Sequence, residues 1–291
     1  MPVAVVTDST ASLPAEVAAD RGITVVPLQV VIGAHAYEEG IDEEATPAHV
    51  AEALAAFTPV STSRPTPAAF EAAYRAAAES GASHVVSVHL SGEISGTFES
   101  AQLGARKSPI PVTCIDTRQV GMGVGFAALA AVDAADAGAD AVESAQAART
   151  RAALTTSLFY VDTLEYLRRG GRMGAAAAIV GSALAVKPIL TISEGRVVVA
   201  EKVRTSSRAL ARLEELAVAA AGDADVEAAV AHLAAPDRAD QLAERLGAHL
   251  PGLGERSVWT GEVGAVLGAH VGPGMVAVCV AHRDSSTVVA S

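Results

Sequence analysis

Residues 3–19 read VAVVTDSTASLPAEVAA and set a pattern that recurs along the chain. Val3–Val6 is a β-branched run typical of a buried strand, and Leu13–Ala19 has the spacing of a helix. The polar turn TDS, residues 7–9, follows the strand directly. A strand, a polar turn and a helix in this order predict the first βα unit of an α/β sheet.

The same alternation of strand and helix continues to about Ala153. Thr46-Pro47 and Thr66-Pro67 each place a capping hydroxyl before a proline at the first helical position, which is typical of a helix start. The alternation predicts a mostly parallel sheet with helices on both faces. The expected strands are Ile23–Ile32, His84–Val88 and Val112–Ile115, and the expected helices are Ala68–Glu79, Ser95–Arg106 and, in two pieces, Val124–Ala153.

Beyond Ala153 the pattern changes to that of an α+β unit. SEG, residues 193–195, separates two β-branched runs and predicts a hairpin. We therefore expect two α/β domains, residues 1–155 and 156–291, the second of the α+β kind. Its expected strands are Leu158–Val161, Lys187–Ile192, Arg196–Val203, Val226–His232, Ser257–Thr260 and Met275–Ala281, and its expected helices are Thr163–Arg169, Ser206–Ala221, Arg238–Leu250 and Val263–Ala269.

The composition limits what a pocket in this protein can bind. Apolar residues make up 51% of the 291 residues but aromatic residues only 3%, so the core is built from aliphatic side chains. An aliphatic pocket suits an alkyl chain better than a flat ring that needs stacking partners. An Ala- and Val-rich proteome gives the same composition whatever the function, and that alternative stays open.

The charge and the first residues argue against several classes of partner. The net charge of −12 disfavours nucleic acid and an anionic membrane surface, because both need clustered Lys and Arg. The opening MPVAVVTDST lacks the basic region that begins a signal peptide. The longest apolar run, Ala175–Val186, contains Gly181 and Ser182 and is too short to span a membrane. We expect a cytoplasmic protein without stable membrane insertion.

Polar residues gather where predicted strands end, which is where open α/β sheets bind ligands. Thr62 lies in STSRP, residues 61–65, whose hydroxyls and Arg64 offer hydrogen-bond donors to an anion. A polar connector between two helices explains the same residues. Asp8, in the TDS turn, is either a ligand-binding residue or part of a helix cap.

Two further polar segments are candidates for an anion site. Ser95 lies in SGEISGT, residues 91–97, where glycines and the free N–H groups of a helix start can approach an anion. A helix cap after a flexible loop explains Ser95 equally well. His270 lies in HVGPG, residues 270–274, a tight turn in which it either donates to a carboxylate or is structural.

Basic residues stand out in one part of this acidic chain. They can form a positive patch that receives a phosphate or an acidic partner. On the residues alone, ordinary surface charge is the preferred explanation. The residues are Arg168, Arg169, Arg172, Lys187, Lys202 and Arg204.

Taken together, these segments resemble the DegV family, whose members include the fatty-acid-binding subunit of bacterial fatty acid kinase. The resemblance covers nearly the whole chain and rests on the number and order of the segments. Arg64 stands where the family often has Gln, and Phe98 follows SGT where Tyr is usual. The segments are VTDSTASLP, STSRPTP, SGTFESA, YLRRGGRMG, VKPIL, EGRVVVAEKVRT and HVGPG.

The resemblance implies two α/β domains with a fatty acid in an apolar pocket between them. Thr62 and Ser95 match hydroxyls that bind the carboxylate, and His270 matches the histidine at the head group. Arg172 and Arg204 match basic positions that engage the kinase subunit or the acyl phosphate. The resemblance thus implies a binding protein without a cofactor or catalysis of its own. Such a protein presents a long-chain fatty acid to a separate ATP-binding kinase subunit, which phosphorylates it to acyl phosphate.

Two other functions remain open on the sequence. A Ser/His hydrolase would use Ser95, His270 and Asp8, but the local order G-x-x-S-G differs from the nucleophile elbow G-x-S-x-G. A plain metabolite-binding domain would bind a small polar acid in place of a long-chain fatty acid. The sequence contains no Walker loop, which agrees with an ATP site on another protein.

Overall fold

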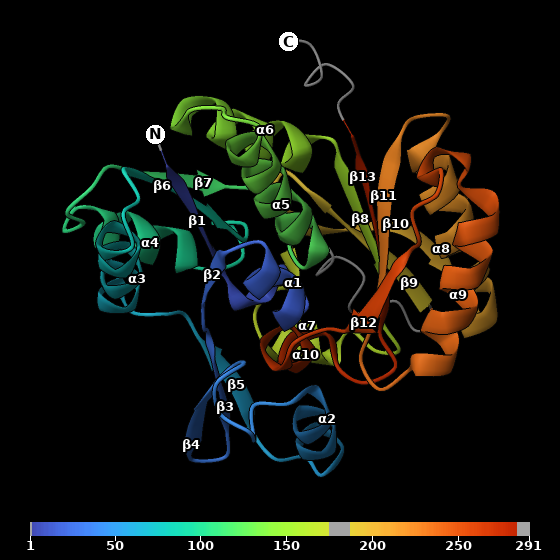
Figure 1. Ribbon diagram of the computed structural model, residues 1–291. Helices are drawn as coiled ribbons and strands as arrows, with labels where there is room; N and C mark the ends of the chain where they lie inside the picture. Colours follow the sequence, from blue (N-terminus) through green and yellow to red (C-terminus); the bar gives the residue numbers. More distant parts are fainter. Residues whose placement is uncertain (1, 175–186, 284–291) are drawn as a thin grey trace.

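The computed structural model describes residues 2–174 and 187–283, and the apolar run 175–186 lies outside them. Two large sheets stand side by side, and layers of helices enclose and separate them (Figure 1). Among the described residues, no helix combines the length and the apolar character that crossing a membrane requires.

The first sheet has the strand order β2-β1-β6-β7, and all its strands run parallel. This confirms the mostly parallel sheet predicted from the alternation of strands and helices. The chain places β2 on one side of β1 and β6 on the other, so the carboxyl ends of β1 and β6 form the switch point of the sheet. The strands are β1 (Val3–Asp8), β2 (Ile23–Val26), β6 (His84–His89) and β7 (Val112–Asp116).

Helices cover both faces of this sheet. Val6 packs into a core with Phe70 on one face, whereas its neighbour Val5 packs with Phe126 on the other. Adjacent strand residues point to opposite faces, so both valines are buried. The helices are α3 (Pro67–Glu79) and α4 (Thr97–Ala105) on the first face, α5 (Met122–Asp136) and α6 (Ala141–Ala153) on the second, and α1 (Ala15–Asp20) beside β2.

The second sheet is mostly antiparallel and has the order β10-β9-β8-β13-β11-β12. It contains the predicted β9–β10 hairpin, which confirms the α+β character of this part of the chain. Helices α8 (Ser206–Ala221) and α9 (Pro236–His249) cover one face. The strands are β8 (Thr155–Tyr160), β9 (Lys187–Ser193), β10 (Arg196–Val203), β11 (Val226–His232), β12 (Trp259–Glu262) and β13 (Val276–His282).

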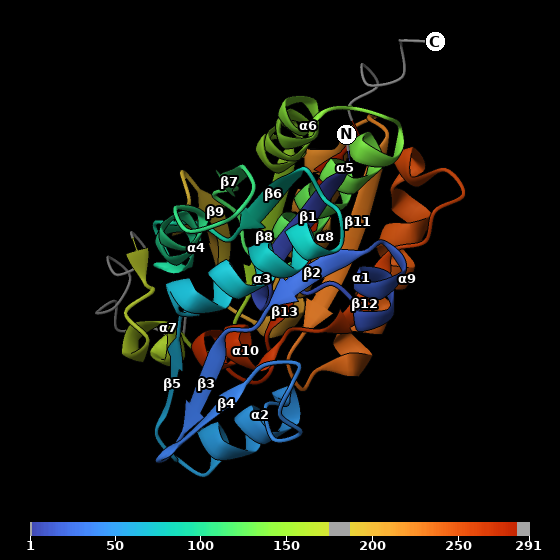
Figure 2. The same cartoon turned by 60° about the vertical axis from the view of Figure 1, so that its left-hand side comes forward.

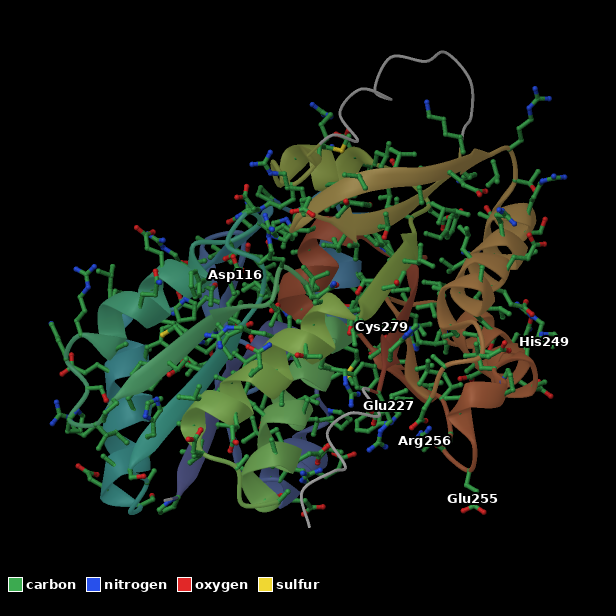
Figure 3. The ribbon with its side chains drawn as sticks, turned by 90° about the horizontal axis from the view of Figure 1, so that it is seen from above. Asp116, Glu227, His249, Glu255, Arg256 and Cys279 are labelled. Carbon is green, nitrogen blue, oxygen red and sulfur yellow. The ribbon has the colours of Figure 1, made fainter. Side chains whose placement is uncertain are left out.

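Helices α5 and α6 lie between the two large sheets and belong to both. Phe126 of α5 shares one core with Val5 of the first sheet and Cys279 of the second. Arg151 of α6 pairs with Glu227 of β11, and the view from above shows Glu227 and Cys279 beside these helices (Figure 3). The two halves of the chain are therefore joined by a shared core. The predicted boundary near residue 155 stays a prediction.

A third, smaller sheet corrects two expectations from the sequence. The run Ile23–Ile32 is not one strand, because Pro27 has no N–H to continue the ladder and the chain leaves the first sheet there. STSRP is not a connector between helices, because Thr62 pairs with Val30 in this sheet. The sheet has the order β4-β3-β5, with β3 (Gln29–Ile32), β4 (His35–Glu38) and β5 (Val60–Ser63).

The small sheet and α2 (Pro47–Ala55) form what we call the small lobe, which lies below the first sheet in Figure 1. Thr46 caps α2 by accepting from the backbone N–H of His49, as its sequence predicts. Val30 and Val50 of the lobe share a core with Val266 of α10 (Ala265–Val271). The lobe therefore packs on a helix from the end of the described chain. Helix α7 (Glu165–Arg169) packs against α10.

Candidate ligand-binding site

The small lobe and α10 bring together two predicted site residues that are 208 positions apart. The Oγ1 atom of Thr62, on β5, lies 2.8 Å from the Nε2 atom of His270, on α10. Both side chains are partly buried. The site therefore combines residues from opposite ends of the chain.

His270 is uncharged at neutral pH. Burial, and secondly the positive charge of Arg172, lower the pKa of its imidazole to about 4. Its Nδ1 atom is buried and has no hydrogen-bond partner among the described residues. A side chain at Gly170 would collide with Nδ1, so the imidazole ring can occupy this position because residue 170 is glycine.

The unpartnered Nδ1 atom determines which way the hydrogen bond to Thr62 runs. A buried N–H group without an acceptor is rarer, and costs more free energy, than a buried nitrogen lone pair without a donor. The proton of the neutral ring therefore lies on Nε2, which donates to Thr62 Oγ1. The Thr62 hydroxyl keeps its own proton free, so it can donate to an anion.

Ser95 lies in the segment that leads from β6 into α4. Its Oγ atom is 2.9 Å from Thr97 Oγ1 and accepts from the Thr97 backbone N–H at 3.3 Å. Helix α4 thus begins at Thr97, two residues later than predicted, and its N-cap residue is Gly96 and not Ser95, although the Ser95 hydroxyl accepts from the first N–H of the helix. The Ser95 hydroxyl is half-buried and remains within reach of a ligand.

Two arginines hold the Ser95 segment near Thr62 and His270. Arg64, at the end of β5, donates to the carbonyl of Gly96 at 3.1 Å and pairs with Glu99. Arg172 donates to the carbonyl of Ile94 at 3.3 Å and acts electrostatically on His270. The residues on both sides of Ser95 are therefore tied to the elements that carry the Thr62–His270 pair.

Arg204 is placed differently from the other predicted residues. It follows β10 directly and is exposed. Within the part of the chain that the structure describes, it forms no hydrogen bond or ion pair with Thr62, Ser95, His270 or Arg172. Thr62, Ser95, His270 and Arg172 therefore belong to one site. Arg204 is not connected to it by a hydrogen bond or ion pair among the described residues.

The turn of the β9–β10 hairpin fixes the other side of the Ser95 segment. Ser91 Oγ donates to the carbonyl of Gly195 at 2.7 Å, and Arg196 pairs with Glu93. Gly195 has a φ of +75°, and a side chain there would collide with Ser91 Oγ. This contact, which we call the hairpin latch, joins the two halves of the chain beside the site.

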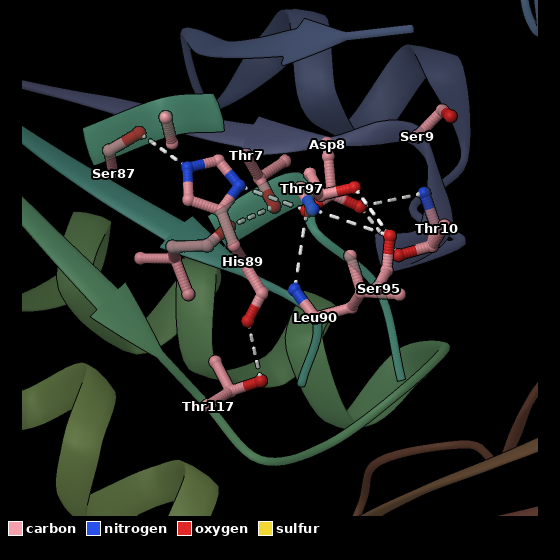
Figure 4. A network of polar contacts seen from close by, with 12 residues as sticks. Thr7, Asp8, Ser9, Thr10, Ser87, His89, Leu90, Ser95, Thr97 and Thr117 are labelled. Atoms are coloured by element: carbon pink, nitrogen blue, oxygen red, sulfur yellow. Dashed lines mark hydrogen bonds and ion pairs between the residues drawn. The ribbon is translucent and has the colours of Figure 1, made fainter. Parts of the chain in front are cut away.

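Sequence reasoning missed a buried polar network at the switch point of the first sheet (Figure 4). Asp8 Oδ2 accepts from His89 Nδ1 at 2.9 Å and from the backbone N–H of Leu90 at 3.2 Å. His89 Nε2 lies 2.7 Å from Ser87 Oγ, which in turn lies 2.8 Å from the hydroxyl of Tyr74. The period-two spacing of Ser87 and His89 on one strand was the available signal.

These contacts argue against the hydrolase interpretation. Each residue of the expected Ser95–His270–Asp8 relay is hydrogen-bonded to a residue outside it. Asp8 is paired with His89, His270 with Thr62, and Ser95 with Thr97, so the relay does not form. The order Asp8–His89–Ser87 resembles a catalytic relay, but the side chains of Ser87 and His89 are fully buried. A substrate cannot reach that hydroxyl in this arrangement.

An apolar space lies between the two halves of the chain beside α10. This inner cavity, about 80 Å³ in volume, is lined by Leu267 and Val271 on either side of His270 along α10. Val120 and Met122 from the first half and Phe159 from the second complete much of its wall. The predicted apolar pocket between the halves is present, although Thr62, Ser95 and His270 do not line it.

A larger opening, which we call the outer cleft, lies between α1 and β12 and has a volume of about 520 Å³. Glu39, Trp259 and Thr260 are among its wall residues. Among the described residues, His, Cys, Asp and Glu side chains form no group suited to a metal ion. Apolar residues make up most of the walls of both spaces, and Glu16, Glu39 and Thr260 are among the polar residues that line the outer cleft.

Known proteins resemble this chain over nearly its whole length. A family model described as "Uncharacterised protein, DegV family" matches residues 2–283. A DegV domain-containing protein of Streptomyces coelicolor is 55% identical over 281 residues, which are 97% of this chain and 99% of the relative.

Two solved structures show the same fold over nearly the full length. A DegV family protein from Thermus thermophilus, described for its fatty acid binding, superposes with a TM-score of 0.88 at 34% identity, covering 97% of this chain and 100% of that one. DegV from Bacillus subtilis, described as a fatty acid binding protein, gives 0.88 at 33% identity with the same coverage. By sequence and by fold, the chain belongs to the DegV family.

Proposed function

We propose that this protein binds a long-chain fatty acid, with the carboxylate at Thr62 and Ser95 and the alkyl chain entering the inner cavity. The observation that carries the proposal is the Thr62–His270 pair, which leaves the Thr62 hydroxyl free to donate beside an apolar cavity. Relatives with 33% and 34% identity over nearly the whole chain are described as fatty acid binding. His270 acts here by orienting Thr62.

The two ends of the ligand contribute differently. Burying about 15 methylenes gives at most about 12 kcal/mol at ~0.8 kcal/mol each, before the costs of association and ordering are subtracted. Hydrogen bonds from Thr62 and Ser95 to the carboxylate contribute less than this and fix the orientation of the ligand. The alkyl chain of the ligand then provides most of the affinity, and the hydroxyls of Thr62 and Ser95 fix the position of the head group.

The same proposal extends to a partner. A separate ATP-binding kinase subunit phosphorylates the exposed carboxylate to acyl phosphate, with Arg172 and Arg204 facing the partner or the phosphate. No lysine of the sequence follows a glycine directly, so a Walker loop is absent from the chain itself. We place the protein in the cytoplasm, as a binding subunit without catalysis of its own and without a cofactor.

Native mass spectrometry of protein purified without detergent tests the binding step. We expect a mass increment equal to one fatty acid, and repeated absence of any increment would contradict the proposal. Thr62→Ala with Ser95→Ala should weaken binding of a sixteen-carbon acid at least tenfold, because each hydroxyl bonded to a charge contributes about 1.5–3 kcal/mol.

Ser61→Ala is the matched control for the head-group residues. Ser61 precedes Thr62 on β5, is exposed, and points to the opposite face of the strand, so its loss should leave affinity unchanged. Equal affinity of the double variant and the wild type would rule out the assigned head-group site. Competition by a small polar acid but not by a long-chain acid would favour a metabolite-binding domain instead.

A further inference from the structure

The outer cleft is a space that the proposed function does not use. It lies between α1 and β12, which are side by side in both views of the ribbon (Figure 1 and Figure 2). Its volume of about 520 Å³ is within the range of about 300–1,000 Å³ that is typical of small-molecule sites. Thr62, Ser95 and His270 do not line it. A ligand of moderate size therefore fits here, apart from the head-group site.

The charged residues of the outer cleft all have the same sign. Glu16 lies on α1, Glu39 follows β4 and Glu262 ends β12, and all three line the cleft. No Lys, Arg or His is among its described wall residues. Glu262 lies 3.8 Å from His232 Nδ1, but that nitrogen accepts from the N–H of Ala235 and therefore carries no proton. The cleft thus attracts a cation and repels the carboxylate of a fatty acid.

Glu39 has an acceptor atom that the described protein leaves unused. The residue is only 9% exposed, and its Oε1 atom accepts from the backbone N–H of Val266 at 2.8 Å. Its Oε2 atom is buried and has no hydrogen-bond partner in the described parts of the chain. Buried polar atoms are normally satisfied, because leaving a buried charge without donors costs free energy. Oε2 therefore lacks a donor that a ligand can supply.

Gly264 brings the Glu39 carboxylate close to the open space. A side chain at position 264 would collide with this carboxylate. The φ of Gly264 is −62°, which any residue adopts, so the close approach of the carboxylate and not the backbone conformation requires glycine here. Glu39 and Gly264 both line the cleft. The carboxylate therefore lies at the wall of the cleft with no side chain of residue 264 to shield it.

Much of the remaining wall is apolar and includes the one tryptophan of the sequence. Trp259 packs edge-to-face against Phe126 of the core, with the ring centroids 6.0 Å apart, and it also lines the cleft. Leu13 and Ile41 are further wall residues. Aromatic rings attract cations, and aliphatic side chains favour an apolar ligand body. The wall therefore suits a cation that carries an apolar group.

We propose that the outer cleft binds an organic amine, whose ammonium group donates to Oε2 of Glu39 and whose apolar body lies against Trp259. Hydrogen bonds between an ammonium group and a carboxylate are short and strong. The described His, Cys, Asp and Glu side chains form no group suited to a metal ion, so an organic cation fits this charge better than a metal does. The proposal does not rest on fatty acid binding, since the two ligands have opposite charges and different polar partners.

Two probes of nearly the same shape test the proposal on wild-type protein. Phenylbutylamine carries a positive charge at pH 8, and phenylbutanol carries none. Each is titrated into delipidated protein while the fluorescence of Trp259 is recorded. We expect the amine to bind at least tenfold more tightly than the alcohol. An amine that binds no more tightly than the alcohol would overturn the proposal, because the cleft would then be a plain apolar site.

Glu39→Gln identifies the group that binds the cation. Gln keeps an acceptor for the N–H of Val266 but carries no charge, so affinity for phenylbutylamine should fall at least tenfold while affinity for phenylbutanol stays unchanged. Glu43→Gln is the matched control, since Glu43 is an exposed acid between β4 and α2 that does not line the cleft. It should change neither affinity.

The outcomes for the amine are separate from those for the fatty acid. Equal amine affinity in Glu39→Gln and in wild type would overturn the proposed amine site, whatever the fatty acid titrations show. An equal loss of amine affinity in Glu39→Gln and Glu43→Gln would also overturn it, because the effect would then be one of overall charge. The two probes are compared on wild-type protein, so that comparison decides the question even if Glu39→Gln does not fold.

Discussion

The carboxylate of Glu39 accepts a hydrogen bond of 2.8 Å from the backbone N–H of Val266, across 227 positions of the sequence. Glu39 follows β4 in the small lobe, and Val266 lies in the first turn of the helix that carries His270. Its second oxygen, Oε2, is buried and has no hydrogen-bond partner in residues 2–174 and 187–283. This one acid therefore links the lobe of Thr62 to the helix of His270.

Glu39→Gln tests the charge of this link separately from its hydrogen bond. Burial raises the pKa of Glu39 above its ordinary value of 4.5, so ionisation costs free energy in the folded state. The contribution of the raised Glu39 pKa to the stability of the folded protein is fully present below the pKa of the unfolded state. It is lost as the pH rises through the higher pKa of the folded state. Gln keeps an acceptor for Val266 but carries no charge. The variant should therefore gain stability relative to wild type at pH 8 but not at pH 4.

Urea unfolding at both pH values measures the difference for Glu39→Gln. Glu39→Ala is the comparison, because it leaves the Val266 N–H without its acceptor and should destabilise the protein by about 1–3 kcal/mol at both pH values. A Gln variant that behaves like the Ala variant would show that the charge itself stabilises the link.

His270 should remain neutral well below neutral pH in delipidated protein. Its pKa of about 4, below the usual 6.5, means that the unfolded chain takes up a proton before the folded protein does. Stability should then fall as the pH drops from about 6.5 toward 4, by at most about 3 kcal/mol from this group. His270→Gln should lose less stability over the same range.

Proton NMR of the His270 ring checks this value directly. A bound carboxylate adds negative charge nearby, so the pKa should rise when a fatty acid is added. A ring that titrates near 6.5 without ligand would contradict the assigned environment and the hydrogen-bond direction derived from it.

Asp8 should act on ligand binding through the position of the Ser95 segment. Its carboxylate fixes the backbone N–H of Leu90, where that segment begins. Asp8→Asn removes one acceptor oxygen from a fully buried network, and we expect a loss of about 2 kcal/mol or more in stability together with weaker fatty acid binding. Thermal unfolding and a fatty acid titration measure the two effects.

Ser87→Ala is the control for Asp8→Asn. Ser87 contacts the Nε2 atom of His89, on the side of the ring that faces away from the Ser95 segment. It should lower stability by about 1–3 kcal/mol without changing affinity. Equal losses of affinity in both variants would mean that the network acts only through overall stability.

The hairpin latch should be sensitive to the size of residue 195. Gly195→Ala combines a positive φ with a collision against Ser91 Oγ, whereas Gly222→Ala has a φ of +53° and open space around the added carbon. Gly222→Ala should cost about 1 kcal/mol from the backbone alone. Gly195→Ala should cost more and should also weaken fatty acid binding, as measured by urea unfolding and titration. Identical effects would exclude a role for the latch.

Local sequence signals predicted the parts of the fold that depend on local chemistry. The Thr46 and Thr66 caps start their helices as expected, and the β-branched runs around Val5 form the parallel sheet. The small sheet was missed because β5 is the polar run VSTS and β4 is HAYE, neither of which has a strong strand pattern. Their pairing with β3 is set by tertiary packing on α10.

The site was predictable only in part, for a similar reason. Thr62, Ser95 and His270 were found through the family resemblance, but no spacing in the sequence places Thr62 against His270 across 208 positions. Asp8 was noted without its partner, since His89 ends an apolar strand that looks complete without it. The roles of Arg64 and Arg172 depend on their carbonyl acceptors, Gly96 and Ile94, which no spacing in the sequence predicts.

The order of the second sheet has a consequence for how this protein is made. Strand β8, the first of that sheet to be synthesised, lies between β9 and β13, and β13 is made after every other described strand. Met275 and Val278, at the end of the described chain, line the inner cavity together with Leu158 of β8. The cavity is therefore unfinished until residues 275–278 have been synthesised, so the fatty acid that we propose for it can enter only after that point.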